Sequence, residues 1–142
     1  MTLGRILAID YGTKRTGIAV TDPLRIIPGG LTTVATHELM SFLAGYFGKE
    51  TVDLIVVGHP TNMNGEESAS MQQIRPFVEK LRKQYPDKEV VMFDERFTSV
   101  LAQKAILDAG IKKMARRNKA LVDEVSATII LESYMSSIHY KK

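Results

Sequence analysis

The chain has 142 residues, which suits one domain with a single hydrophobic core. Its composition, 44% hydrophobic and 25% charged, is that of an ordinary soluble globular protein, and its formal charge of +3 is too small to identify a partner. Because it has no cysteine, and its three histidines (His37, His59 and His139) do not stand at a zinc-ligand spacing, any metal would have to bind oxygen ligands.

No segment of the sequence predicts a membrane or secretory location. The longest apolar runs, such as residues 54–57, are far too short to span a bilayer. The first residues lead directly into an apolar strand pattern, without the basic and apolar regions of a signal peptide. The absence of cysteine agrees with a reducing compartment. We therefore expect a cytoplasmic protein that does not contact a membrane.

The first half of the chain predicts mainly strands. Apolar runs bounded by turn-forming residues predict strands over residues 5–10, 16–22, 26–35 and 53–58. Before the last of these, residues 37–49 suit a helix, for which Thr36 is a candidate N-cap. The run over 53–58 is continuously apolar, which is typical of a strand covered on both faces.

The second half of the chain alternates helices and strands. A helix is predicted over residues 66–85, because apolar residues recur on one of its faces and Pro86 ends it. The elements predicted after it are a strand over 89–93, a helix from Thr98 or Ser99 to Ala109, and a last helix over 119–136. We expect residues 137–142 to form a frayed tail.

This order of elements predicts an α/β fold with a mixed five-stranded sheet. The first three strands are expected to form an antiparallel meander, because they follow one another without a helix between them. The alternation that follows requires right-handed crossovers and parallel strands, so helices should cover both faces of the sheet. We expect the whole chain, residues 1–142, to form this one domain.

Acidic residues stand where the predicted apolar strands end. Asp10 closes the first strand, and Asp94 and Glu95 close the last one. Asp123 lies early in the last helix and shares a face with apolar residues one and two turns later. Neighbouring residues of a strand point to opposite faces, so the pattern does not decide between Asp94 and Glu95. Any one of these acids alone could also be a solvated strand-end or cap residue.

If these carboxylates gather, they would form a site for divalent cations. Carboxylates within a few Å of one another repel and raise one another's pKa, and a divalent cation relieves this repulsion. Asp and Glu without His or Cys suit Mg²⁺ or Mn²⁺. Two such ions about 4 Å apart can activate water and stabilise the leaving oxygen in phosphodiester cleavage. The pattern is therefore compatible with a metal-dependent nuclease, although three solvated strand-end or cap residues would also fit it.

The glycine-rich segment after the first strand allows two other interpretations. Residues 12–17 have the frame of a Walker A motif, but Ile18 and Ala19 stand where Lys and Ser or Thr are required. A strand follows instead of a helix, so no helix N-terminus is available for a phosphate, and we reject a P-loop. Actin-like kinases and ATPases also place an Asp and a glycine-rich hairpin after a strand. They close two such domains around a nucleotide, whereas this chain has only one.

Four segments carry a resemblance to a known family. They are residues 7–17 (LAIDYGTKRTG), 56–65 (VVGHPTNMNG), 94–99 (DERFTS) and 123–127 (DEVSA). Together they resemble the YqgF family, also called RuvX-like, of Holliday junction resolvases and pre-16S rRNA nucleases. The resemblance implies a ribonuclease-H-like fold, hydrolysis of nucleic-acid phosphodiesters, and maturation of the 16S rRNA 5′ end. It also implies that the catalytic acids are Asp10, Glu95 and Asp123, which selects Glu95 over Asp94.

Basic residues near the acids are candidates for binding nucleic-acid phosphates. Arg15 and Arg96 flank two of the acids, and either could grip a phosphate or neutralise the carboxylates. A further basic group precedes the last helix and consists of Lys112, Lys113, Arg116, Arg117 and Lys119. Such a group is usually a solvated loop, but in a nuclease we expect it to bind the phosphate backbone.

The sequence leaves three functions open. The first is a Mg²⁺- or Mn²⁺-dependent nuclease on structured RNA, acting in 5′-end maturation of pre-16S rRNA. A Holliday junction resolvase would use the same chemistry on branched DNA, but it needs two active sites and hence a dimer. A non-catalytic RNA-binding assembly factor would keep the fold without cleaving, and the intact set of acids argues against it. The sequence does not distinguish a monomer from a homodimer.

Overall fold

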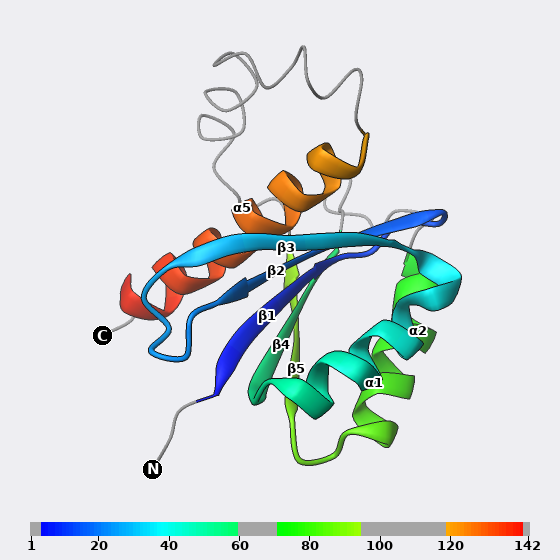
Figure 1. Cartoon of the computed structure of the whole chain (residues 1–142), viewed down its shortest axis with the longest axis horizontal. Coiled ribbons are helices and arrows are strands. Elements are labelled where there is room, and N and C mark those ends of the chain that lie inside the picture. The colour runs from blue at the N-terminus through cyan, green and yellow to red at the C-terminus, as the bar shows by residue number, and fades with distance from the viewer. Residues whose placement is uncertain (1–3, 60–70, 95–118, 141–142) are drawn as a thin grey trace.

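The computed structural model describes residues 4–59, 71–94 and 119–140, and Figure 1 shows how their elements are arranged. The elements are β1 (Arg5–Asp10), β2 (Arg15–Thr21), β3 (Pro28–Ala35), a short 3-10 helix η1 (Thr36–Glu38), α1 (Leu39–Lys49), β4 (Val52–His59), α2 (Met71–Gln84), β5 (Glu89–Asp94) and α5 (Lys119–Tyr140). None of the helices in these described ranges is long and apolar enough to cross a membrane.

The five strands form one mixed sheet with the order β3-β2-β1-β4-β5. β2 is antiparallel to both β1 and β3, whereas β4 is parallel to both β1 and β5. The predicted mixed five-stranded sheet is therefore confirmed, and its order and directions fit the ribonuclease-H-like fold. Because β1, β4 and β5 are parallel, their carboxyl ends meet at one edge of the sheet.

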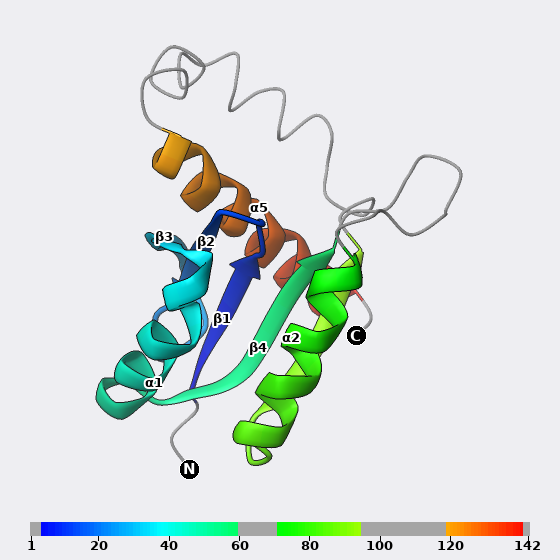
Figure 2. The same ribbon diagram turned by 90° about the vertical axis from the view of Figure 1, so that its right-hand side faces the viewer.

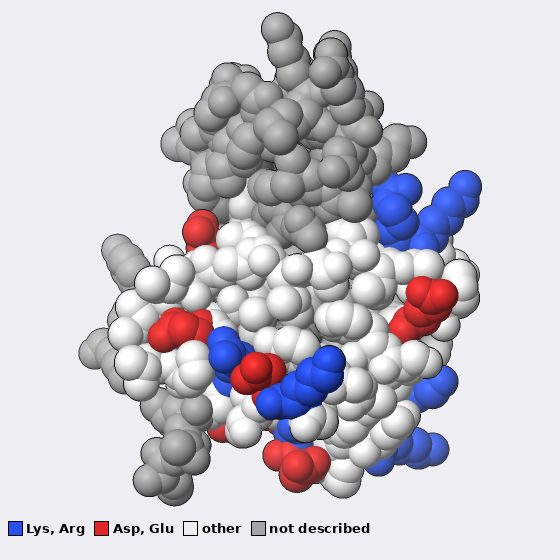
Figure 3. All heavy atoms as spheres, viewed as in Figure 1, with Lys and Arg blue, Asp and Glu red and all other residues white. Residues whose placement is uncertain are grey.

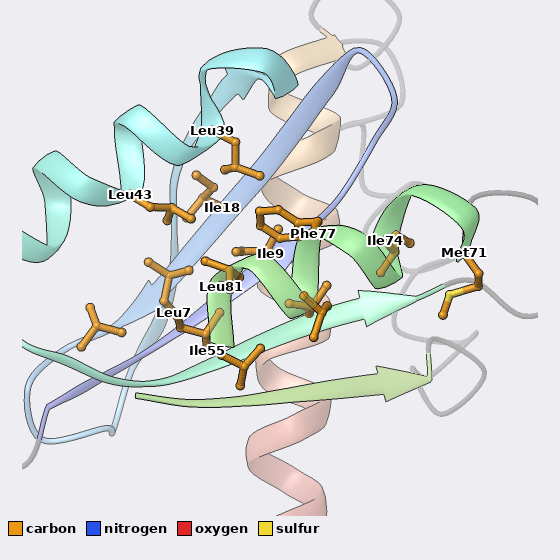
Figure 4. Packing of buried hydrophobic residues seen from close by; sticks show 14 residues of the cluster. Leu7, Ile9, Ile18, Leu39, Leu43, Ile55, Met71, Ile74, Phe77 and Leu81 are labelled. Atoms are coloured by element: carbon orange, nitrogen blue, oxygen red, sulfur yellow. The ribbon is translucent and has the colours of Figure 1, made fainter. Parts of the chain in front are cut away.

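One face of the sheet packs against α1 and α2. Leu7 and Ile9 of β1 point to this face and belong to a large buried cluster. Figure 4 shows Ile74, Phe77 and Leu81 of α2 turned towards the same cluster. The spacing of these three residues places them on one stripe of the helix, which is the pattern of an amphipathic helix on a core.

The opposite face of the sheet is covered by α5, as Figure 2 shows. Ile6 and Ala8 of β1 point to this face and form a second cluster with Ala127 and Ile130 of α5. A Cβ atom added at Gly58 of β4 would collide with the side chain of Ile130. Small residues in the sheet therefore allow α5 to pack at close range.

The start of α1 differs from the sequence prediction. The sequence predicts Thr36 as the helix cap, but Thr36 lies in η1, and its hydroxyl donates a hydrogen bond of 2.6 Å to the carbonyl oxygen of Gly12. α1 begins at Leu39 without any side-chain cap hydrogen bond. The predicted cap is wrong because a tertiary contact takes the hydroxyl that a local cap would need.

Two other boundaries differ from the prediction by more than one residue. β3 begins at Pro28 rather than at residue 26, because the carboxylate of Asp22 accepts the amide hydrogens of Ile26 and Ile27 at 2.7 Å each and holds them in the loop. α5 runs to Tyr140, past its predicted end at residue 136, and so includes the first part of the segment expected to fray. The helix predicted from Thr98 or Ser99 to Ala109, and residues 66–70 of the preceding one, lie outside the described residues.

The close approach of α5 can be tested by adding one methyl group. Gly58→Ala should lower the free energy of unfolding by about 1–3 kcal/mol, because the new Cβ overpacks the buried side chain of Ile130. Ile130→Val removes the terminal methyl group that the new Cβ meets. The double variant should therefore lose less stability in urea unfolding than the sum of the two single variants.

Gly48→Ala in α1 is the matched control for this experiment. A Cβ atom at Gly48 meets nothing within 4 Å. Because the substitution only removes the flexibility of a helical glycine, the free energy of unfolding should rise by about 0.5–1 kcal/mol. Strictly additive effects of Gly58→Ala and Ile130→Val would contradict the contact between α5 and β4.

Candidate active site

The candidate site lies at the edge where the carboxyl ends of the parallel strands meet. Asp10, the last residue of β1, is in register with Gly58 of β4, and His59 of β4 is in register with Asp94 of β5. The first turns of α5 lie at the same end of the molecule (Figure 2). In open α/β sheets, the crevice outside the carboxyl ends of the strands is the usual place for a ligand.

Asp10 is the first polar residue of β1 on the face that α5 covers. Ile6 and Ala8 lie in the cluster beneath α5, and alternation along the strand assigns Asp10 to the same face. The four residues before Asp10 are each at most 1% exposed, whereas Asp10 itself is partly exposed. The carboxylate therefore stands at the boundary between the core and the solvent.

β5 follows the same alternation as β1. Val90 packs on the side of α1 and α2, whereas Phe93 lies in the cluster beneath α5. The side chain of Asp94 and all of Glu95 lie outside the described residues. The structure therefore defines the faces of β5 up to Phe93.

Asp123 belongs to α5 and stands one helical turn before Ala127. Ala127 is fully buried in the cluster that also contains Ala8 of β1. The side chain of Asp123 is not among those described. Among the residues that the structure does describe, no three acidic or histidine groups gather as a metal site.

The turn between β1 and β2 is held by a pair of threonines. The hydroxyl of Thr36 donates to the carbonyl oxygen of Gly12 at 2.6 Å and accepts from the hydroxyl of the buried Thr16 at 2.9 Å. The amide of Thr36 also donates to the carbonyl oxygen of Lys14 at 3.0 Å. A Cβ atom at Gly12 would collide with the carbonyl oxygen of Arg15, so this tight turn requires a glycine there.

We call Thr16 and Thr36 the threonine clamp. No sequence motif predicts it, because it joins three segments that are separate in the sequence: the turn, the start of β2 and η1. A further contact ties the turn to α2, since the rings of Tyr11 and Phe77 lie with their centroids 4.9 Å apart. The turn that follows Asp10 is therefore held by contacts with η1 on one side and with α2 on the other.

Arg15 lies at the same edge as Asp10. It is the first residue of β2, its side chain is exposed, and two residues further on Gly17 is in register with Asp10. For Lys119, the structure describes the backbone at the start of α5 but not the side chain. The other residues predicted to bind nucleic acid lie outside the described residues: Arg96, Lys112, Lys113, Arg116 and Arg117.

Removing the threonine clamp should destabilise the turn that follows Asp10. Thr36→Val keeps the shape of the side chain but removes the hydroxyl that is hydrogen-bonded to the carbonyl oxygen of Gly12 and to the hydroxyl of Thr16. We expect the free energy of unfolding, measured in urea, to fall by about 1–3 kcal/mol. Thr36→Ser keeps the hydroxyl, and Thr32→Val changes another threonine just before the clamp, so both should have much smaller effects. An equal loss in Thr36→Ser would assign the effect to the methyl group.

Comparison with known proteins places this arrangement in a family. A family model described as "RuvX: Holliday junction resolvase" matches residues 4–137. The chain belongs to the RuvX family. The resemblance inferred from the four sequence segments is therefore confirmed over nearly the whole chain.

Bacterial relatives of this RuvX chain share the printed name "Putative pre-16S rRNA nuclease". The protein of Phocaeicola vulgatus is 62% identical, over 97% of this chain and 99% of its own length. That of Porphyromonas gingivalis is 62% identical over 95% and 98%, and that of Flavobacterium johnsoniae is 53% identical over 94% and 96%. Both the RuvX description and these names denote nucleases, so the predicted enzyme class, a hydrolase acting on ester bonds, is confirmed.

Proposed function

We propose that this chain is a divalent-metal-dependent nuclease that cleaves the 16S rRNA precursor during maturation of its 5′ end. Its catalytic and metal-holding acids are Asp10, Glu95 and Asp123. The observation that carries this proposal is the position of Asp10, at the carboxyl end of the central strand and on the face that α5 covers. α5 is also the element that contains Asp123.

Packing beneath α5 supports pairing Asp10 with Asp123. Ala8 and Ala127 share one buried cluster. Asp10 follows Ala8 by two residues of strand, and Asp123 precedes Ala127 by one turn of helix. Asp10 and Asp123 therefore each lie a short distance along the chain from the same buried cluster.

Strand alternation supports Glu95 over Asp94 as the second acid. Phe93 lies on the face that α5 covers, which is also the face of Asp10. If the chain continues in an extended form, the residue two positions after Phe93 would share that face, and the residue directly after it would not. This argument agrees with the family resemblance, which also selects Glu95.

The proposed donor set consists of carboxylates alone, and it fits Mg²⁺ or Mn²⁺ rather than a softer metal. Two such ions, when bound, would activate water and stabilise the leaving oxygen. The three carboxylates would hold the ions at the sheet edge, while Arg15 and Arg96 would contact the phosphates on either side of the cleaved bond. The basic group from Lys112 to Lys119 would bind the backbone further along the strand.

Two observations bear on the substrate. The names of the relatives support RNA as the substrate. A role in ribosome biogenesis would also place the chain in the cytoplasm. The family description supports a second candidate, cleavage of four-way DNA junctions. Labelled precursor rRNA, linear DNA and four-way junctions, each incubated with the protein, would distinguish these candidates.

Neutralising any one of the three acids should abolish cleavage and leave the protein folded. Asp10→Asn, Glu95→Gln and Asp123→Asn each remove a charge from a cluster that repels itself without metal, so thermal stability without metal should be unchanged or higher. Cleavage of precursor rRNA in Mn²⁺ measures activity, and far-ultraviolet circular dichroism checks the fold. Asp87→Asn, at an exposed aspartate between α2 and β5, is the matched control and should cleave normally.

The same assay decides the other parts of the proposal. EDTA should stop cleavage, and full activity in EDTA would refute the metal mechanism. An acid variant with normal cleavage would remove that residue from the site. If no substrate is cleaved by the wild type but precursor rRNA is bound, the chain is a non-catalytic assembly factor.

A double substitution in the basic group should separate binding from chemistry. Each phosphate contact contributes about 0.7 to 0.9 to the slope of log affinity against log salt concentration. Arg116→Ala with Arg117→Ala should therefore flatten that slope by about 1.5 if both side chains bind phosphate. Affinity should fall alike for different RNA sequences, because phosphate contacts carry no base information. Cleavage at saturating RNA should change far less than in the acid variants.

Lys80→Ala with Lys83→Ala is the matched control, since both lysines are exposed on α2 and the charge change is the same. This pair should leave the salt slope unchanged. If the variant with Arg116→Ala and Arg117→Ala also keeps the wild-type salt slope, these two side chains do not bind phosphate, and the basic group is a solvated loop.

A further inference from the structure

The loop between β2 and β3 exposes three large aliphatic side chains. Leu24, Ile26 and Ile27 are 69%, 65% and 67% exposed, and we call them the aliphatic knuckle. They are the large hydrophobic residues that the described part of the chain leaves in solvent. β2 runs antiparallel to β1, so the knuckle lies at the end of the sheet opposite Asp10. Nothing in the proposed nuclease mechanism requires it there.

The knuckle is held outward by specific polar contacts. The carboxylate of Asp22 accepts the amide hydrogens of Leu24, Ile26 and Ile27 at 3.2, 2.7 and 2.7 Å. These amides lower the pKa of Asp22, with the Ile27 amide contributing most. Arg25 has a left-handed backbone with φ of 58°, and its Nε atom donates to the carbonyl oxygen of Gly4 at 2.8 Å. A loop with this many internal bonds presents its aliphatic side chains in a defined arrangement.

An open hollow lies beside the knuckle, with a volume of about 650 Å³. Leu24, Arg25, Ile26 and Pro28 line one wall, and Glu132, Met135 and Ser136 of α5 line the other. Arg25 approaches Asp53 at 3.7 Å, and no ion pair joins it to Glu132 within the described ranges. The hollow is therefore lined by four apolar residues and three polar ones, with Arg25, which is paired with Asp53, on one wall and Glu132 on the other.

The charge around the knuckle argues against nucleic acid as its partner. Acidic and basic side chains are interleaved on the lower part of the face drawn in Figure 3, rather than gathered as one basic patch. Asp22, Asp53 and Glu132 near the loop would repel a phosphate backbone, which binds to surfaces of positive charge. An apolar protein surface with charges of both signs is the better match.

We propose that this face binds a second copy of the same chain across a two-fold axis. A two-fold interface must be complementary to itself. This face has both a protruding part, the aliphatic knuckle, and a hollow that could receive it. In such a dimer, the exposed Leu24 and Ile26 of one copy would pack into the partly apolar hollow of the other. The same rotation brings Glu132 of one copy opposite the partner's Arg25, so each wall meets the opposite charge.

The size of the face predicts a weak dimer. A standard stable interface buries about 800 Å² on each partner, and weak, transient contacts bury less. An interface made of three aliphatic side chains and one hollow would bury less surface area than this on each partner. We therefore expect a dissociation constant on the order of tens of micromolar.

This arrangement has a consequence for the active sites. β1 has six residues, so Asp10 lies about 20 Å from the end of the sheet that carries the knuckle. In the dimer, the two sheet edges that carry Asp10 would therefore point away from each other. Each copy would act alone on its substrate, unlike a resolvase whose two sites face one junction. The dimer itself does not depend on the proposed nuclease activity.

Sedimentation equilibrium of the full chain, from about 1 to about 300 µM, tests the proposal. The wild type should pass from monomer to dimer in this range. Ile26→Asp places a charge in the apolar contact and should raise the dissociation constant at least about tenfold. Glu132→Lys brings like charges together and should raise it at least about threefold.

Glu79→Lys, at an exposed glutamate of α2, is the matched control for the charge change and should dimerise like the wild type. All the substituted side chains are exposed, so circular dichroism and urea unfolding should be unchanged. A wild type that stays monomeric throughout would overturn the proposal and leave the knuckle to another partner. A dimer that neither Ile26→Asp nor Glu132→Lys weakens would also overturn it, because the interface would lie elsewhere.

Discussion

The burial of the middle of β1 is the constraint on which the rest of the structure depends. Four consecutive residues of this strand are at most 1% exposed, and the strand pairs with β2 along one edge and β4 along the other. An unpaired charge inside such a strand would be very costly. The first carboxylate can stand only where the strand leaves the core, which is the position of Asp10. The location of the proposed site therefore follows from the packing of the residues before it.

The two faces of the sheet contribute to the site in different ways. Large side chains of α1 and α2 fill the space on one face and hold the strands in place. On the other face, Ala8, Ala19 and Gly58 are small, so α5 lies close to the sheet. Close packing leaves a helix little freedom to rotate or slide. A residue carried by α5 is thereby held more firmly than one on a loop would be.

Most of the sheet could be predicted from the sequence, because its strands are short apolar runs ended by turn-forming or acidic residues. Asp10 could be predicted for the same reason. The contacts of Thr36 and Gly58 could not, because they join residues that are far apart along the chain and leave no local pattern. The choice between Asp94 and Glu95 needs the register of β5, which the sequence does not contain. Among the sequence features, only the family resemblance selects Glu95.

The position of α5 in the chain also affects how the protein is made. The strands that α5 covers are synthesised first, and α5 comes far later in the sequence. Until it emerges from the ribosome, Ala8, Ala19 and Val56 have no helix to pack against, so one face of the sheet stays in water. Contacts between such distant segments slow folding and expose apolar surface to aggregation. The step that finally covers this face is also the step that delivers Asp123, so the nascent chain would complete its core and its proposed nuclease site together.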